Sequence, residues 1–136
     1  MNLTVPERRL MMLDGETVLF RADNRAWYTL EKLTGQQLQE FLAQFQDGGM
    51  PPMQVLLDLA YSLSATDRAR SGEPVSYDRD SEQYLRFAER VPAMLTADGA
   101  DAFLTPIMLM VGEAFRVDVS PGKQEPARGN ARKRQA

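Results

Sequence analysis

The chain contains neither cysteine nor histidine. Without cysteine, it can form neither a disulfide framework nor a thiolate metal site. Without histidine, it lacks the commonest general base and the commonest neutral metal ligand, which excludes histidine-dependent catalytic triads and histidine-ligated zinc sites. We therefore expect no catalytic, cofactor-binding or metal-binding residues in this chain, and we predict that the protein is not an enzyme.

Long apolar runs are also missing. The longest candidate, Ile-Met-Leu-Met-Val at residues 107–111, is far shorter than the roughly 20 residues that a helix needs to cross a bilayer. The N-terminus has no charged region followed by a long apolar run, so we expect no secretory signal. These absences predict a soluble intracellular protein.

Charge is spread unevenly along the chain. Residues 121–136 hold five Lys or Arg and one Glu, a net charge of +4, whereas the whole chain carries −3, so residues 1–120 carry −7. The last segment has no large apolar residue and cannot bury enough surface to offset the entropy of ordering. We predict that 121–136 is a disordered basic tail and that 1–120 forms one domain, which is long enough to bury a core.

A hairpin signal comes first in this domain. Asp14 and Gly15 lie between two apolar runs, and an Asp-Gly pair accepts the positive φ angles of a tight hairpin turn. We predict strands near residues 10–13 and 16–21. The residues before position 10 are expected to be an irregular lead-in, because a proline among them discourages regular structure.

Two amphipathic helices are expected next, separated by Gly35. The apolar residues of the first helix recur at helical spacing and include Trp27, which we interpret as a core anchor rather than a platform for stacking a ligand. Glycine is favoured where a helix ends in a left-handed conformation. We predict the first helix over about 23–33, capped by Asp23, and the second over about 36–46.

The rest of the domain is expected to be helical apart from one long loop. The expected elements are an apolar helix opened by Pro51 and Pro52, a polar loop over 64–80, a helix over about 82–91 capped by Ser81, and one or two helices over 97–116 interrupted near Pro106. The sequence therefore predicts a mainly α fold, a small helical domain with an N-terminal β-hairpin and a disordered C-terminal tail.

Two groups of carboxylates could bind a hard cation or act in acid–base chemistry. One group is Asp78, Asp80 and Glu82, and the other is Asp98 with Asp101. Both groups fall in expected loops or at expected helix N-termini, where the helix dipole favours acidic side chains. We interpret them as structural.

Methionines and the basic tail are the other features that could bind a partner. Methionine adapts to varied partners but also fills gaps in cores, and we favour core packing for Met11, Met12, Met50, Met53, Met94, Met108 and Met110. The tail could contact phosphates, yet it has no interleaved aromatic residues and follows an acidic domain. We therefore expect no nucleic-acid partner.

The order of these signals carries a resemblance to a known family. The positions involved are Asp14-Gly15, Trp27-Tyr28, Leu30-Glu31, Thr34-Gly35 and Leu38, followed by the apolar helix Val55 to Leu63. This pattern, over about residues 10–116, resembles the tail assembly chaperones of long-tailed (siphovirus-type) bacteriophages and prophages. The resemblance implies a non-enzymatic protein in the cytoplasm of the bacterial host that binds the tape measure protein and helps tail tube subunits polymerise around it.

Several further expectations follow. The chain offers many apolar residues in short helices, including Met50, Met53 and the run at 107–111. A protein that shields long helices would present such apolar surface in a repeated array, so we expect a homo-oligomer such as a dimer or ring. Chaperones of this kind are often made in two lengths by a programmed ribosomal frameshift, and codons for Gly122-Lys123 are compatible with a slippery site. The alternative is a small helical adaptor or regulatory protein unrelated to phage, whose basic tail binds an acidic partner. The sequence does not identify the partner-binding residues.

Overall fold

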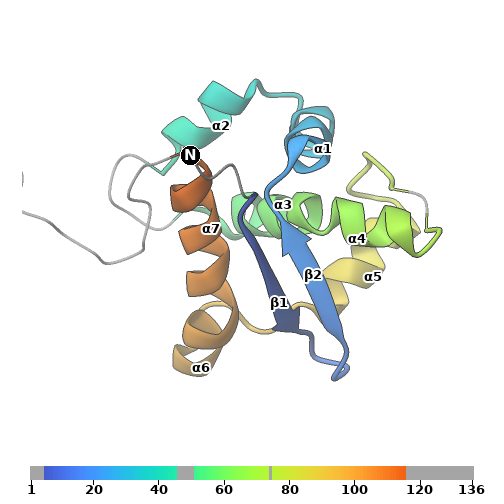
Figure 1. Ribbon diagram of the computed structural model, residues 1–136, viewed down its shortest axis with the longest axis vertical. Coiled ribbons are helices and arrows are strands. Elements are labelled where there is room, and N and C mark those ends of the chain that lie inside the picture. The colour runs from blue at the N-terminus through green and yellow to red at the C-terminus, as the bar shows by residue number, and fades with distance from the viewer. Residues whose placement is uncertain (1–4, 46–50, 74, 116–136) are drawn as a thin grey trace, which may run out of the picture.

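A two-stranded antiparallel hairpin and a series of short helices make up the computed structural model, which describes residues 5–45, 51–73 and 75–115 (Figure 1). The elements are β1 (Glu7–Met11), β2 (Thr17–Arg21), α1 (Asn24–Thr34), α2 (Leu38–Ala43), α3 (Met53–Leu63), α4 (Ala65–Arg70), α5 (Glu82–Arg90), α6 (Ala97–Gly99), η1 (Ala100–Leu104) and α7 (Thr105–Phe115). The predicted fold class, a mainly helical domain with an N-terminal hairpin, is confirmed. The predicted tail, 121–136, lies outside the described residues.

The hairpin begins earlier than the sequence suggested, and its loop is longer. β1 starts at Glu7, directly after Pro6, so the prediction of an irregular lead-in up to residue 9 was wrong. A proline can stand just before a strand because no ladder donor is needed there. In the turn, the Met12 N–H donates to the Glu16 carbonyl at 2.8 Å, and Gly15 has φ 88°. The left-handed glycine thus closes a three-residue loop rather than a two-residue turn.

The hairpin lies across the middle of the molecule, with α7 beside β1 and α4 beside β2 (Figure 1). Leu10 is paired with Val18, and the side chains of this pair and of Phe20 are buried in the core. Arg9 and Arg21 occupy the alternate positions, on the outward face of the same strands. The division is not complete, because Arg8 is paired with Phe20 on the inner face and Leu19, paired with Arg9, is buried on the other.

α1 follows its sequence signals closely. The Asp23 carboxylate accepts the Ala26 N–H at 3.0 Å, and Gly35 ends the helix with φ 73° while its N–H donates to the Glu31 carbonyl. α2 is shorter than predicted, and position 46 of that prediction lies outside the described residues. Capping at both ends explains why α1 could be located from local sequence alone.

Trp27 lies at the edge of the core rather than inside it. Its half-buried ring packs on Phe115, with ring centroids 4.9 Å apart. The interior is formed by other aromatic side chains, notably Phe20, Tyr61 and Phe103, none of which is exposed. The interpretation of Trp27 as a core anchor is thus only partly right, because the fully buried face of α1 is formed by smaller residues such as Ala26 and Leu30.

The prediction of a polar loop over 64–80 is wrong for residues 65–70, which form α4. This helix buries Ala65, Thr66 and Arg68. Because Arg68 is a charged residue, its buried position does not add to an apolar pattern in the sequence, and the helical spacing of the buried residues could not be recognised. Residues 71–73 and 75–81 do lie outside the helices, as predicted.

The C-terminal helical segment is continuous through a π-helical turn. α6, η1 and α7 follow one another without a gap, and the Thr105 N–H donates to the Ala100 carbonyl. Pro106 has no N–H for the α-helical bond, and the wider turn just before it accommodates that loss. The predicted interruption near Pro106 therefore takes the form of a π-bulge.

The methionines divide between core and surface. Met12, Met94, Met108 and Met110 are buried, as predicted, whereas Met11 and Met53 are exposed and Met50 lies outside the described residues. The apolar run at 107–111 is also core apart from Leu109, so it does not supply an association surface. Within the described ranges, no helix has both the length and the apolarity to cross a membrane.

Candidate recognition surface

The carboxylates singled out in the sequence make local contacts. Asp78 accepts the Asp80 N–H at 2.8 Å, and Glu82 pairs with Arg86 one turn further along α5. Asp98 lies in the first turn of α6. Among the residues that the structure describes, no three acidic side chains converge as a metal site would require. These contacts are those of turns and helix starts.

A buried polar network joins α3 to α5. Asp58, only 1% exposed, accepts hydrogen bonds from Arg79, from the Tyr84 hydroxyl at 2.7 Å and from the Gln54 amide at 3.0 Å. Burial, followed by the hydrogen bond to Asp58, raises the pKa of Tyr84 well above its usual 10.0. The hydrogen bond to Asp58 also raises the pKa of Arg79. This arrangement keeps the tyrosine neutral and the arginine charged, so it serves as a fixed tie between helices.

Arg68 forms a second internal contact. Its guanidinium lies over the rings of Tyr61 and Phe87, 4.3 and 4.6 Å from their centroids, and its Nε donates to the Ser64 hydroxyl. Glu73 is 3.6 Å from the same guanidinium. A hollow of about 220 Å³ beside it has mixed charges in its lining. Arg68 therefore packs α4 against the core through its two aromatic neighbours.

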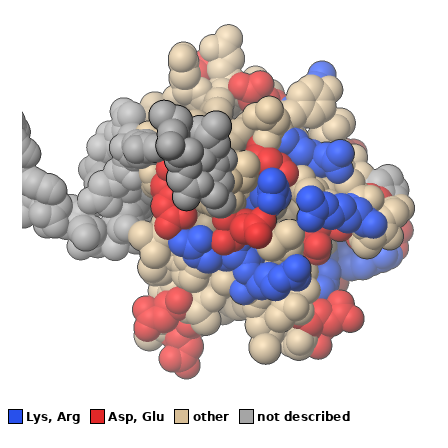
Figure 2. Space-filling model, in the orientation of Figure 1, with Lys and Arg blue, Asp and Glu red and all other residues tan. Residues whose placement is uncertain are grey.

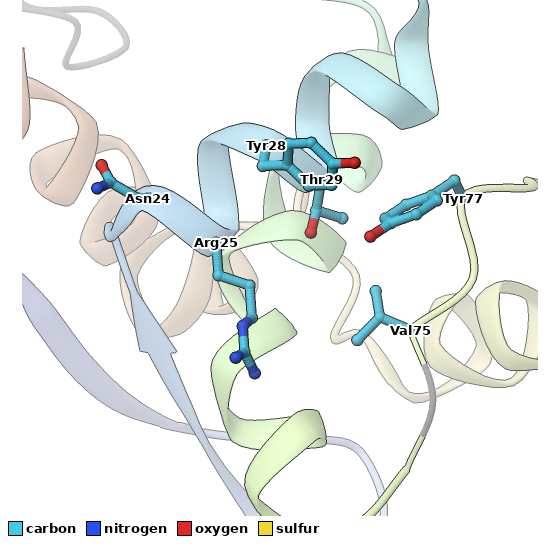
Figure 3. A pocket seen from close by; sticks show the side chains of 6 residues that line it. All are labelled: Asn24, Arg25, Tyr28, Thr29, Val75 and Tyr77. Atoms are coloured by element: carbon cyan, nitrogen blue, oxygen red, sulfur yellow. The ribbon is translucent and has the colours of Figure 1, made fainter.

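Two adjoining hollows run along the exposed side of α1, and they share Asn24 and Arg25. We call them together the α1 groove. The first, of about 540 Å³, is lined by Asn24, Arg25, Tyr28, Thr29, Val75 and Tyr77 (Figure 3). The second, of about 400 Å³, is lined by Arg21, Asp23, Asn24, Arg25, Thr66 and Arg70. One half of the groove is thus aromatic and the other is rich in arginine.

The aromatic half presents two tyrosines to solvent. Tyr28 from α1 is 53% exposed and Tyr77 is 44% exposed, and their rings meet edge to face with centroids 5.9 Å apart. Beneath them, the Thr29 hydroxyl is buried and has no hydrogen-bond partner among the described residues. In Figure 3 this hydroxyl and that of Tyr77 both point toward the middle of the hollow.

A buried tyrosine positions the wall opposite α1. The Tyr61 hydroxyl donates to the Ser76 carbonyl at 2.7 Å and accepts the Ser76 N–H at 3.2 Å. Burial raises the pKa of Tyr61, which keeps this hydroxyl protonated and able to donate. Because Ser76 lies between Val75 and Tyr77, the two bonds anchor both of these lining residues to α3.

The arginine half contains both paired and unpaired cations. Arg21 is held by Glu7 at 2.7 Å and by Asp23 at 3.3 Å. Asp23 also caps α1 and accepts the Thr66 hydroxyl at 2.5 Å, so its oxygens are occupied.

Arg25 and Arg70 have no carboxylate within 4.0 Å anywhere in the described ranges. Figure 2 shows Lys and Arg side chains interspersed with Asp and Glu across the face of the hairpin and toward α4.

Sequence reasoning did not identify this groove. One signal was available, since Arg25, Tyr28 and Lys32 are spaced to share the face of α1 opposite its buried residues. The contributions of Arg70 and Tyr77 could not be found, because both fell in the expected polar loop. In chemical terms the groove offers cationic donors, apolar rings and a free hydroxyl, which suit anionic and apolar groups on a ligand.

Comparison of the chain with protein-family models, with curated proteins and with solved structures finds no match.

Proposed function

We propose that this protein is a tail assembly chaperone of a siphovirus-type bacteriophage or prophage. It binds the tape measure protein in the cytoplasm of the bacterial host and promotes polymerisation of tail tube subunits, without catalysis, metal or cofactor. The observation that carries the proposal is that Tyr28, one of the resembling positions, lines the α1 groove beside Arg25 of the same helix. The helix on which the resemblance is centred thus contributes to a groove that could receive a partner segment.

The surface chemistry also supports a binding role. Large apolar side chains remain exposed on several elements, namely Met11, Leu13, Tyr28, Met53, Tyr77, Leu85, Leu95 and Leu109. Exposed apolar side chains can cover the apolar face of a partner helix until another protein replaces them. On this proposal, the chaperone shields the long tape measure helices until tube subunits assemble around them.

Co-expression tests the proposal directly. The tape measure protein encoded beside this chain is expressed alone, with this chain, or with an unrelated helical protein of similar size. We expect it to be soluble only with this chain, because exposed apolar helices aggregate when unshielded. Equal solubility in all three samples would overturn the chaperone proposal and favour the adaptor alternative.

We further propose that copies of the chain associate, since a repeated array would shield a long helix better than one copy. The run at 107–111 cannot supply the interface, because all of it except Leu109 is buried. Association would instead use exposed residues such as Leu85 or Leu95. Sedimentation velocity should show a dimer or larger ring, and a monomer throughout the micromolar range would contradict the proposal.

A further inference from the structure

We propose that the α1 groove binds a short partner segment that carries a carboxylate and a large apolar side chain close together. The inference rests on the proposed function, because the partner is then a segment of the tape measure protein. In the bound state the carboxylate lies against Arg25 and Arg70, and the apolar side chain lies against Tyr28 and Tyr77.

The placement of unpaired cations is the first argument. Most Lys and Arg in the described ranges have a carboxylate within 4.0 Å, namely Arg8, Arg21, Arg68, Arg79, Arg86 and Arg90. The exceptions are Arg9, Arg25, Lys32 and Arg70.

Arg25 and Arg70 line the groove, Lys32 lies 5.6 Å from the centre of the Tyr28 ring, and Arg9 is on the same hairpin face as Arg21. Carboxylates are plentiful over residues 1–120, which carry −7, yet none that the structure describes lies within 4.0 Å of these cations. A carboxylate supplied by a partner would complete the pairing, and two guanidinium groups can hold it by charge-assisted hydrogen bonds.

The aromatic half supplies the apolar contact. Tyr28 is carried by a capped helix and Tyr77 by the segment that Tyr61 anchors, so the backbone that carries each ring is fixed before a ligand arrives. Rigid tyrosines offer large contact area at low entropic cost. Val75 lines the same hollow, which makes this part of the groove suitable for an aliphatic or aromatic side chain.

The free hydroxyl of Thr29 favours a peptide as the ligand. Buried polar groups are almost always hydrogen-bonded, and this hydroxyl lines the hollow without a partner among the described residues. A peptide backbone carries both N–H and C=O groups, either of which would satisfy a threonine hydroxyl.

A single-stranded nucleic acid could also use tyrosine and arginine. It is disfavoured because only a few cations are uncompensated here and because the surrounding domain is acidic, whereas nucleic acids are bound through many phosphate contacts.

The experiment begins with overlapping tape measure peptides of about 15 residues, long enough to span a groove on one domain. The full chain is applied to these peptides, and the best binder is titrated by fluorescence anisotropy. We expect the bound peptides to share an Asp or Glu next to a large apolar residue. Replacing that acid by lysine should abolish binding.

Paired variants test each half of the groove. One double variant is Arg25→Glu with Arg70→Glu, and the other is Tyr28→Ala with Tyr77→Ala. We expect each double variant to lower the affinity for the peptide about tenfold or more, as loss of interface anchors does. The matched control is Arg86→Glu on α5, which reverses the charge of an exposed arginine outside the groove and should alter affinity by less than about twofold. Melting curves check that every variant is folded, and the lysine peptide should regain binding to the glutamate variant.

The outcomes separate this inference from the proposed function. If the wild-type chain keeps the tape measure soluble and the groove variants do so equally well, the groove inference is wrong and the chaperone proposal stands. If the wild-type chain neither solubilises the tape measure nor binds its peptides, both are wrong. Tighter binding of a single-stranded oligonucleotide than of any peptide, lost in the groove variants, would also overturn the peptide inference.

Discussion

Arg79 holds the buried carboxylate of Asp58 with two nitrogen atoms, its Nε 3.1 Å from Oδ1 and its Nη2 2.5 Å from Oδ2. Asp58 belongs to α3, and Arg79 lies in the turn that leads into α5. The pair therefore fixes the end of the segment that begins at Val75 and forms one wall of the groove. Because Asp58 is excluded from water, its charge depends on partners within the protein.

Removal of the Arg79 charge should destabilise the fold more than removal of an exposed one. We expect Arg79→Met to cost about 3 kcal/mol of the free energy of unfolding, because it leaves a buried carboxylate without its cation. Arg86→Met, which breaks an exposed pair on α5, should cost about 0.5 kcal/mol or less. Urea unfolding of both variants measures the difference. If the two variants lose the same free energy of unfolding, solvent must replace Arg79 as the partner of the Asp58 carboxylate.

Loss of the Tyr61 hydroxyl should loosen the wall that carries Tyr77. Tyr61→Phe keeps the buried ring but removes both hydrogen bonds to Ser76, at a cost of about 1 kcal/mol. Hydrogen exchange at the Ser76 amide should quicken, while exchange in α1 stays unchanged. An unaltered Ser76 exchange rate would show that other contacts position this segment.

Two glycines should respond differently to alanine. At Gly35 the positive φ makes alanine strained by about 1 kcal/mol, although space is free around it. At Gly99 the backbone is ordinary, but an added Cβ would fall on the carbonyl oxygen of Ala93. We therefore expect Gly99→Ala to lower the melting temperature more than Gly35→Ala, and Gly35→Asn to lower it least. The reverse order would contradict the close approach at Gly99.

The contact between the hairpin turn and α5 should weaken in acid. The backbone N–H of Glu16 and the side chain of Arg90 hold the pKa of Asp14 below its ordinary 3.8. A carboxyl whose pKa falls on folding stabilises the protein above the unfolded pKa and loses that contribution as pH drops through the folded one.

Melting of wild type and Asp14→Asn, compared from pH 7 downward, should therefore show a wild-type advantage that shrinks only below an unfolded-state pKa of about 4. The asparagine can still accept the Glu16 N–H, so the comparison isolates the charge. A constant difference at all pH values would contradict the role of Arg90.

Trp27 should matter less to stability than a fully buried ring. Trp27→Ala removes the contact with Phe115 but empties only a half-buried position. Phe103→Ala should cost roughly 3–5 kcal/mol as a core truncation, and Trp27→Ala clearly less. Chemical denaturation measures the free energy of unfolding of both variants. An equal loss of stability would mean that Trp27 is a core anchor after all.

Local signals located most of the elements. Asp23 and Ser81 cap helices where the sequence placed them, and Gly35 ends α1, because each residue acts on backbone groups within a turn of itself. The same reasoning failed at α4. Its buried Arg68 resembles a solvent-exposed residue in the sequence, and its burial is made favourable by the rings of Tyr61 and Phe87 and by the Ser64 hydroxyl, which only the fold brings to it.

The sequence by itself determined the fold class, the hairpin and the capped helices. It also excluded thiolate and histidine-ligated sites, because it contains neither cysteine nor histidine. All of these depend on residue identity or on neighbours a few positions apart. The α1 groove was decided only by the tertiary structure, because Tyr28 and Tyr77 come from distant parts of the chain. Which arginines of the described ranges pair with a carboxylate was likewise decided there, since pairing depends on side chains brought together only when the helices pack.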